Sequence, residues 1–151
     1  MGYVERQGDV LTMGLPAIGH GCDISGFMGG GLGRLVTTRW PEMHAEYVRL
    51  CGTEEFTLGR IFVWEAGDVV IYNLATQVKP GKDARLGAVR SAVRDALADA
   101  YQRGITQLGI PRLGADVGGL EWRDVRRALR EVGWASPVEL VVVNLPRPVK
   151  N

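Results

Sequence analysis

The alternation of short apolar segments with longer amphipathic ones most restricts how this chain can fold. Six short segments have the apolar or alternating pattern of β-strands: 3–7, 17–22, 60–64, 69–74, 107–110 and 138–143. The third and fourth are joined by Glu65-Ala66-Gly67-Asp68, a sequence typical of a hairpin turn. Because strands and helical segments otherwise alternate, the sequence predicts an α/β fold. We expect a three-layer α/β/α sandwich around a mixed, mostly parallel sheet.

The helical segments are recognised by apolar residues that recur every three or four positions. One such pattern starts at Leu32, is interrupted by Trp40-Pro41, and resumes over 43–51. The clearest helix covers 86–101, and a further one covers 122–132. No linker, repeat or low-complexity tract divides these elements, so the sequence predicts a single domain over residues 1–151.

Two glycine-rich segments lie between a predicted strand and a predicted helix. The first glycine loop covers 26–33 and the second covers 114–120. Glycine lets the backbone approach a ligand and expose its N–H groups, and a helix start adds the positive end of a dipole. The pair therefore indicates a clamp for a diphosphate. Ordinary turn chemistry is the alternative, because 21 glycines in 151 residues exceed the average of about 7%.

Composition and missing motifs exclude several classes of protein. The net charge is only +1, so we expect no broad nucleic-acid-binding surface. With two histidines and two cysteines at unsuitable spacings, we expect no metal site, and we interpret the thiols as reduced. The absence of a long apolar run predicts a soluble, cytoplasmic protein without a membrane segment. Neither a P-loop nor a dinucleotide-binding G-x-G-x-x-G motif is present.

Three blocks of sequence resemble the macrodomain family of ADP-ribose-binding modules. Gly8-Asp9-Val10-Leu11 is similar to the family's early motif, and Met28-Gly29-Gly30-Gly31-Leu32 is similar to its first phosphate loop. Ile110-Pro111-Arg112-Leu113-Gly114, followed by Gly118-Gly119-Leu120-Glu121-Trp122, resembles the second. The resemblance covers nearly the whole chain. It is strongest to the branch that contains the terminal ADP-ribose protein glycohydrolase and the bacterial macrodomain antitoxins that remove ADP-ribose from DNA.

The resemblance implies a set of ligand-binding residues. Asp9 would accept a hydrogen bond from the adenine amino group, with Val10 beside it, and a cap for the turn after Gly8 is the alternative role. Asn144 would lie near the adenine or its ribose, or would cap the end of its strand. The remaining residues would line the diphosphate and the distal ribose: Ile24, Ser25, Gly29, Gly30, Gly31, Leu32, Gly114, Ala115, Val117, Gly118 and Gly119.

The same comparison identifies a departure at the catalytic positions. The branch carries a lysine where this chain has Gln77, and one relative carries an aspartate where this chain has Gly118. Glutamine has no titratable proton and forms no Schiff base, so covalent lysine catalysis at this position is excluded. We interpret Asp116 as the base that activates water and Gln77 as the group that orients water or substrate. Lys79 and Lys82 are alternatives that we expect to be solvated.

Three further residues have alternative interpretations. His20 and Cys22 share one face of a strand and can form a nucleophile pair, but we expect core packing. Arg112 fits either a phosphate contact or a structural salt bridge.

The sequence thus predicts a monomeric, cofactor-free ADP-ribosyl glycohydrolase that acts on ADP-ribosylated protein or nucleic acid. A reader module that binds ADP-ribose without cleaving it is the alternative.

Overall fold

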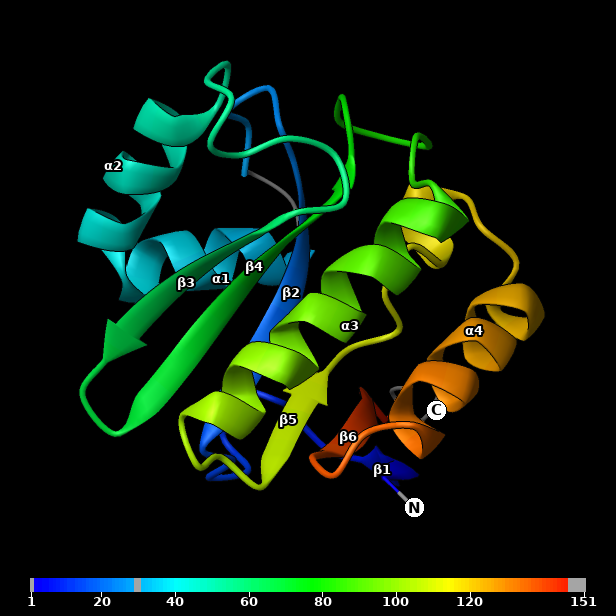
Figure 1. Ribbon diagram of the computed structural model, residues 1–151. Helices are drawn as coiled ribbons and strands as arrows, with labels where there is room; N and C mark the ends of the chain where they lie inside the picture. The colour runs from blue at the N-terminus through cyan, green and yellow to red at the C-terminus, as the bar shows by residue number, and fades with distance from the viewer. Residues whose placement is uncertain (1, 29–30, 147–151) are drawn as a thin grey trace, which may run out of the picture.

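The computed structural model describes residues 2–28 and 31–146, whose helices and strands form three layers (Figure 1). The strands are β1 (Tyr3–Gln7), β2 (Ala17–Asp23), β3 (Ile61–Ala66), β4 (Val69–Gln77), β5 (Gln107–Ile110) and β6 (Glu139–Asn144). The helices are α1 (Gly31–Arg39), α2 (Pro41–Leu50), α3 (Leu86–Gln102) and α4 (Trp122–Trp134). The strands form one sheet in the order β1-β6-β5-β2-β4-β3, in which only β3 runs antiparallel to its neighbour.

The two faces of the sheet are covered by different pairs of helices. Along β6, Leu140 and Val142 pack into the core beneath α3 and α4, whereas Val141 and Val143 pack into the core beneath α1 and α2. This two-residue period is what a strand buried on both faces requires, and it explains the unbroken apolar runs in the sequence. The predicted α/β/α sandwich with a mixed, mostly parallel sheet is therefore confirmed.

Most predicted elements are present, with corrections at their ends. The hairpin between β3 and β4 turns at Gly67 and Asp68 alone, because pairing extends to Ala66 opposite Val69. Helix α2 ends at Leu50, and Cys51 follows it with extended backbone and a partly exposed free thiol. Exposed apolar positions on α1 and α3, such as Leu35, show that the periodicity predicted the helices better than their buried faces.

The topology places the two glycine loops on either side of one crevice. Strand β2 pairs directly with β5. The chain leaves β2 towards α1 on one face of the sheet and leaves β5 towards α4 on the other. Such a point, where neighbouring connections diverge beyond the carboxyl ends of parallel strands, is where α/β folds commonly bind ligands.

Candidate functional site

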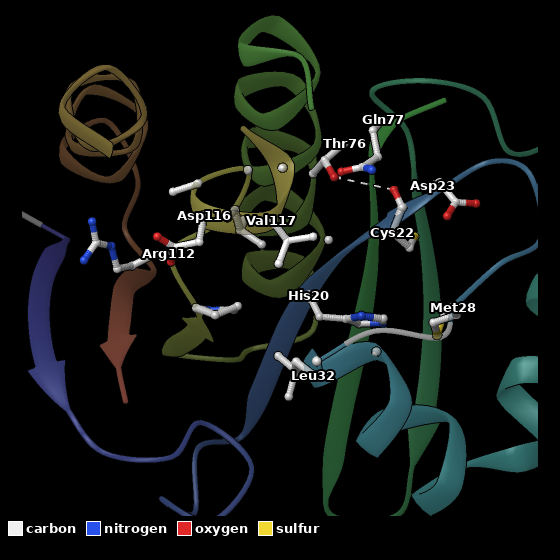
Figure 2. A pocket seen from close by; sticks show the side chains of 18 of the residues that line it. His20, Cys22, Asp23, Met28, Leu32, Thr76, Gln77, Arg112, Asp116 and Val117 are labelled. Carbon is white, nitrogen blue, oxygen red and sulfur yellow. Dashed lines mark hydrogen bonds between the residues drawn. The ribbon is translucent and has the colours of Figure 1, made fainter. Parts of the chain in front are cut away.

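A cavity of about 610 Å³ lies at the carboxyl ends of β2, β4, β5 and β6. Figure 2 shows labelled side chains from β2, from β4 and from both glycine loops around it. A volume of this size is within the range of roughly 300–1,000 Å³ that small-molecule sites occupy. The crevice predicted from the loop positions is thus a real concave site.

Asp23, at the end of β2, holds the turn that leads into the first glycine loop. Its Oδ1 accepts hydrogen bonds from the Ser25 N–H (2.8 Å), the Ser25 hydroxyl (2.7 Å) and the Phe27 N–H (3.3 Å). The Tyr47 hydroxyl donates to the Asp23 main-chain carbonyl at 2.7 Å and lies 3.1 Å from Oδ1. Burial, followed by the neighbouring Cys22 and Asp23 groups, raises the pKa of Tyr47, so this hydroxyl remains a donor. We call this arrangement the Asp23 turn.

His20 lines the cavity, and only one of its two ring nitrogens has a hydrogen-bond partner. Its Nε2 lies 2.6 Å from Asn73 Oδ1 on the paired strand β4. The Asn73 amide donates to the Phe62 carbonyl (3.1 Å) and Met43 Sδ (3.4 Å), so its oxygen faces His20 and the Nε2 position carries the proton. Burial lowers the pKa of His20 and favours the neutral ring. Nδ1 is then an acceptor, and it has no partner.

The second glycine loop is held by close backbone packing. A Cβ atom at Gly118 would lie 2.9 Å from Ala84 Cβ, and the Ala84 N–H donates to the Gly118 carbonyl at 3.2 Å. Asp116 is the only non-glycine described residue with positive φ, at 56°, a conformation that aspartate tolerates better than most residues. Asp116 and Val117 both line the cavity, and Val117 is 76% exposed at the loop tip.

Gln77 closes a third side of the site by holding the segment that follows β4. Its Nε2 donates to the main-chain carbonyls of Lys79 (2.7 Å) and Gly81 (3.0 Å). Asp83 Oδ2 accepts from the N–H groups of Val78 (2.9 Å) and Lys79 (3.1 Å). We call residues 77–83 the side loop. With both amide protons of Gln77 used, only its Oε1 is left to contact water or ligand.

Three side-chain polar atoms in residues 2–28 and 31–146 are buried without a hydrogen-bond partner. They are His20 Nδ1, Arg112 Nε and Asn144 Oδ1. All three residues line this cavity, although they come from three different strand ends. Buried polar atoms normally have partners, and an unpartnered one costs about 1–3 kcal/mol. The unsatisfied polar groups of the described residues are therefore concentrated in the wall of this cavity.

The structure gathers many of the predicted site residues and leaves others outside. The cavity is lined by Gln77, Gly31, Leu32, Gly114, Ala115, Asp116, Val117, Gly118 and Asn144. The residues that do not line it are Asp9, Val10, Ile24, Ser25 and Gly119. Gly29 and Gly30 lie outside the described residues. Asp9 Oδ1 accepts from the Leu11 N–H at 2.9 Å, which is the turn-capping geometry considered for it, and Val10 is buried in the core.

Several lining residues were not assigned to the site from the sequence, although a phosphate contact was one alternative for Arg112 and a nucleophile pair one alternative for His20. His20, Asp23, Thr76 and Arg112 all contribute to the cavity, and each lies within three residues of a strand's carboxyl end. That position is the signal from which they can be found. Of the two alternatives for Arg112, the structural salt bridge is absent, because no carboxylate of the described residues forms an ion pair with it. Its guanidinium stacks instead over the Trp122 ring, 4.6 Å from the centroid.

The described part of the chain lacks two other kinds of site. Its His, Cys, Asp and Glu side chains form no group of three or more that could hold a metal ion. Over the same residues, none of the helices has the length and apolar character needed to cross a bilayer.

Sequence comparison defines the class of protein to which this fold and cavity belong. Residues 19–129 match the Macro domain family, so the chain is a member of the macrodomain family, and the resemblance seen in its motifs is confirmed.

Among its relatives, a DNA ADP-ribosyl glycohydrolase from Thermus aquaticus is 26% identical over 96% of this chain. This chain spans only 41% of that relative's length. An ADP-ribose 1''-phosphate phosphatase from Candida albicans is 24% identical, over 83% of this chain and 90% of the relative. The solved macrodomain of Thermus aquaticus DarG superposes with a TM-score of 0.83 at 26% identity, covering 96% of this chain and all of that one.

Proposed function

We propose that this macrodomain binds ADP-ribose in the cavity and hydrolyses the glycosidic link between ADP-ribose and a modified protein or nucleobase. The observation that carries the proposal is the cavity between the two glycine loops, which is lined by residues of both loops and by the three residues whose buried polar atoms lack a partner. The names of two relatives, a DNA ADP-ribosyl glycohydrolase and an ADP-ribose 1''-phosphate phosphatase, support this choice of ligand.

In this proposal the ligand's diphosphate lies between the two glycine loops. Main-chain N–H groups of 29–32 and 114–119 supply its hydrogen bonds, so the mechanism calls for neither a metal nor a cofactor. Ile24 and Ser25 flank the first loop, while Asp9, Val10 and Asn144 are assigned to the adenosine half. Binding energy from that half then positions the distal ribose for reaction.

Asp116 and Gln77 are assigned to the chemical step. Asp116 lines the cavity, and its carboxylate removes a proton from a water molecule whose oxygen attacks the anomeric carbon of the distal ribose (Figure 2). The bond from that carbon to the modified side chain or base breaks, and its electron pair leaves with the target, which takes a proton from solvent. Gln77 Oε1, the one free polar atom of that side chain, accepts the second hydrogen of the water.

Two measurements test this function in sequence. Titration calorimetry with ADP-ribose measures binding, and absence of binding at millimolar ligand overturns the proposal. Incubation with mono-ADP-ribosylated DNA and protein, with mass detection of released ADP-ribose, then measures cleavage. We expect Asp116→Ala to lose roughly 10²–10⁴-fold in rate while it retains binding, because general-base catalysis contributes about that much. Full activity of this variant would eliminate Asp116 as the base.

The geometry of Gln77 also favours a second candidate function, a reader that holds ADP-ribose without cleaving it. Its amide is fixed by the Lys79 and Gly81 carbonyls and has no proton to give or take at neutral pH. Tight binding with no release from any linkage, and no phosphate release from ADP-ribose 1''-phosphate, would establish the reader function.

A further inference from the structure

Helix α4 carries a line of arginines on its exposed face. Its four arginines outnumber its two acidic residues, although the whole chain has a net charge of only +1. Arg123, Arg127, Arg130 and Trp134 follow one another at intervals of four, three and four residues, which places them on one face of the helix. All four residues are exposed, Trp134 to 62%. We call these four residues the α4 stripe.

Nearby carboxylates neutralise only part of the charge of the α4 stripe. Glu131, which follows Arg130, is already paired with an arginine of α3 at 3.1 Å. Asp124 lies 3.9 Å from Arg123, at the limit of an ion pair, and the Arg123 side chain is 83% exposed. Within residues 2–28 and 31–146, no carboxylate forms an ion pair with Arg127 or Arg130. The stripe therefore presents guanidinium groups that can bind an external anion.

The α4 stripe starts beside the cavity. Helix α4 begins at Trp122, just after the second glycine loop, whose Asp116 and Val117 line the cavity. Figure 1 shows α4 running from that loop along the sheet, beside α3. The rise of an α-helix separates Arg123 from Trp134 by about 17 Å. The exposed cations thus form a line rather than a compact pocket, which suits an extended polyanion better than a single small anion.

We propose that the α4 stripe binds the backbone of a single-stranded nucleic acid, with Trp134 stacking on one of its bases. Arginine suits phosphate because its planar guanidinium donates two parallel hydrogen bonds. Positive charge along a backbone combined with an aromatic ring for a base is typical of single-strand binding. An acidic peptide satisfies the arginines but offers no base to stack on the ring. The stripe lies outside the cavity, so this inference goes beyond the proposed function and does not depend on it.

Fluorescence anisotropy with a labelled, unmodified single-stranded DNA oligonucleotide tests the stripe. We expect wild-type protein to bind with a dissociation constant of roughly 1–100 μM at physiological salt, the range of non-specific nucleic-acid binding. The double variant Arg123→Gln/Arg127→Gln should reduce the slope of log K against log salt by about 1.4, because each phosphate contact to a single strand contributes about 0.7.

A matched double variant, Arg39→Gln/Arg60→Gln, removes the same charge elsewhere. Arg39 ends α1 on the other face of the sheet, and Arg60 precedes the edge strand β3; both are exposed. This variant should keep the wild-type slope. Trp134→Ala should weaken binding by roughly 5- to 150-fold, the range for loss of one stacked base, and Trp134→Phe should retain most of the affinity.

Three results overturn the inference. They are an absence of DNA binding by wild-type protein at low salt, an equal loss in the stripe and matched double variants, and unchanged binding by Trp134→Ala. Equally tight binding of a polyglutamate peptide of the same charge also overturns it, in favour of an acidic protein partner. Calorimetry with ADP-ribose separates the two proposals, because the stripe variants should bind ADP-ribose as wild-type protein does. Failure of the stripe then leaves the proposed function standing, and failure of ADP-ribose binding leaves the stripe standing.

Discussion

The two glycine loops face each other across one cavity but are held by different kinds of interaction. The first follows the Asp23 turn, in which one buried carboxylate oxygen accepts three hydrogen bonds and lies near the Tyr47 hydroxyl. The second packs its backbone against Ala84 and Lys82, so that a Cβ atom would clash with Ala84 at Gly118 and would press tightly on the Lys82 side chain at Gly119. The first loop therefore depends on the hydrogen bonds of the Asp23 carboxylate, and the second depends on glycines that carry no Cβ atom.

The strongest test of this difference removes the Asp23 carboxylate. Asp23→Ala should lower the free energy of unfolding by about 2–4 kcal/mol, because the Ser25 and Phe27 N–H groups lose their buried acceptor. Asp23→Asn is the matched control, since its amide oxygen can still accept, and it should lose less. Urea denaturation measures both variants. Equal losses would show that the charge, and not the acceptor, stabilises the turn.

The second loop should respond to an added methyl group. Gly118→Ala places its Cβ 2.9 Å from Ala84 Cβ, and overpacking of this kind costs about 1–3 kcal/mol. Ala84→Gly removes the obstructing atom, so the double variant should recover most of that loss. The coupling in this double-mutant cycle, measured by thermal unfolding, isolates the contact. Additive effects would mean that Gly118 is not required by its contact with Ala84.

Local sequence patterns predicted the fold well because strand and helix periodicity depends on near neighbours. They also placed both glycine loops at strand ends, since glycine-rich loops between strands and helices have a known location in α/β sheets. Most of the Asp23 turn is local, since Asp23 bonds to Ser25 and Phe27, and an aspartate two residues before a serine is the signal from which it can be found. Only its contact with Tyr47, 24 residues away, has no local pattern. The pairing of His20 with Asn73 depends on the β2–β4 register, which sequence periodicity leaves open.

Some of the residues assigned through family resemblance line the cavity and others do not. Asn144 and Asp116 line the cavity because they follow or end elements whose positions the fold fixes. Asp9 follows β1 at the edge of the sheet, and its carboxylate bonds locally to Leu11. Its proposed contact with adenine stays a prediction.

His20, which lines the cavity, should make the free energy of unfolding depend on pH. Burial lowers the pKa of His20 in the folded protein, so on acidification the unfolded chain takes up a proton near pH 6.5 that the folded protein does not. The contribution of His20 to stability should therefore be constant above about pH 7 and fall as pH drops through 6.5, by at most about 1.4 kcal/mol per pH unit. His20→Gln should flatten this part of the profile, as measured by urea denaturation between pH 7.5 and 5.5. A slope that survives in the variant would have to come from another group.

The smallest expected effect concerns the side loop, residues 77–83, which lies next to the second glycine loop. Gln77→Ala removes two hydrogen bonds to partly exposed carbonyls, so it should cost under about 1 kcal/mol in stability. Amide hydrogen exchange is the more sensitive measurement, because the Val78 and Lys79 N–H groups donate to Asp83 and should lose protection if the side loop opens.

The Ala84 N–H, which donates to the Gly118 carbonyl, reports on the second glycine loop. If Ala84 loses protection together with Val78, the side loop and the second glycine loop open as one unit. If Ala84 keeps its protection, backbone packing alone holds the second loop, and the contrast with the polar Asp23 turn becomes sharper.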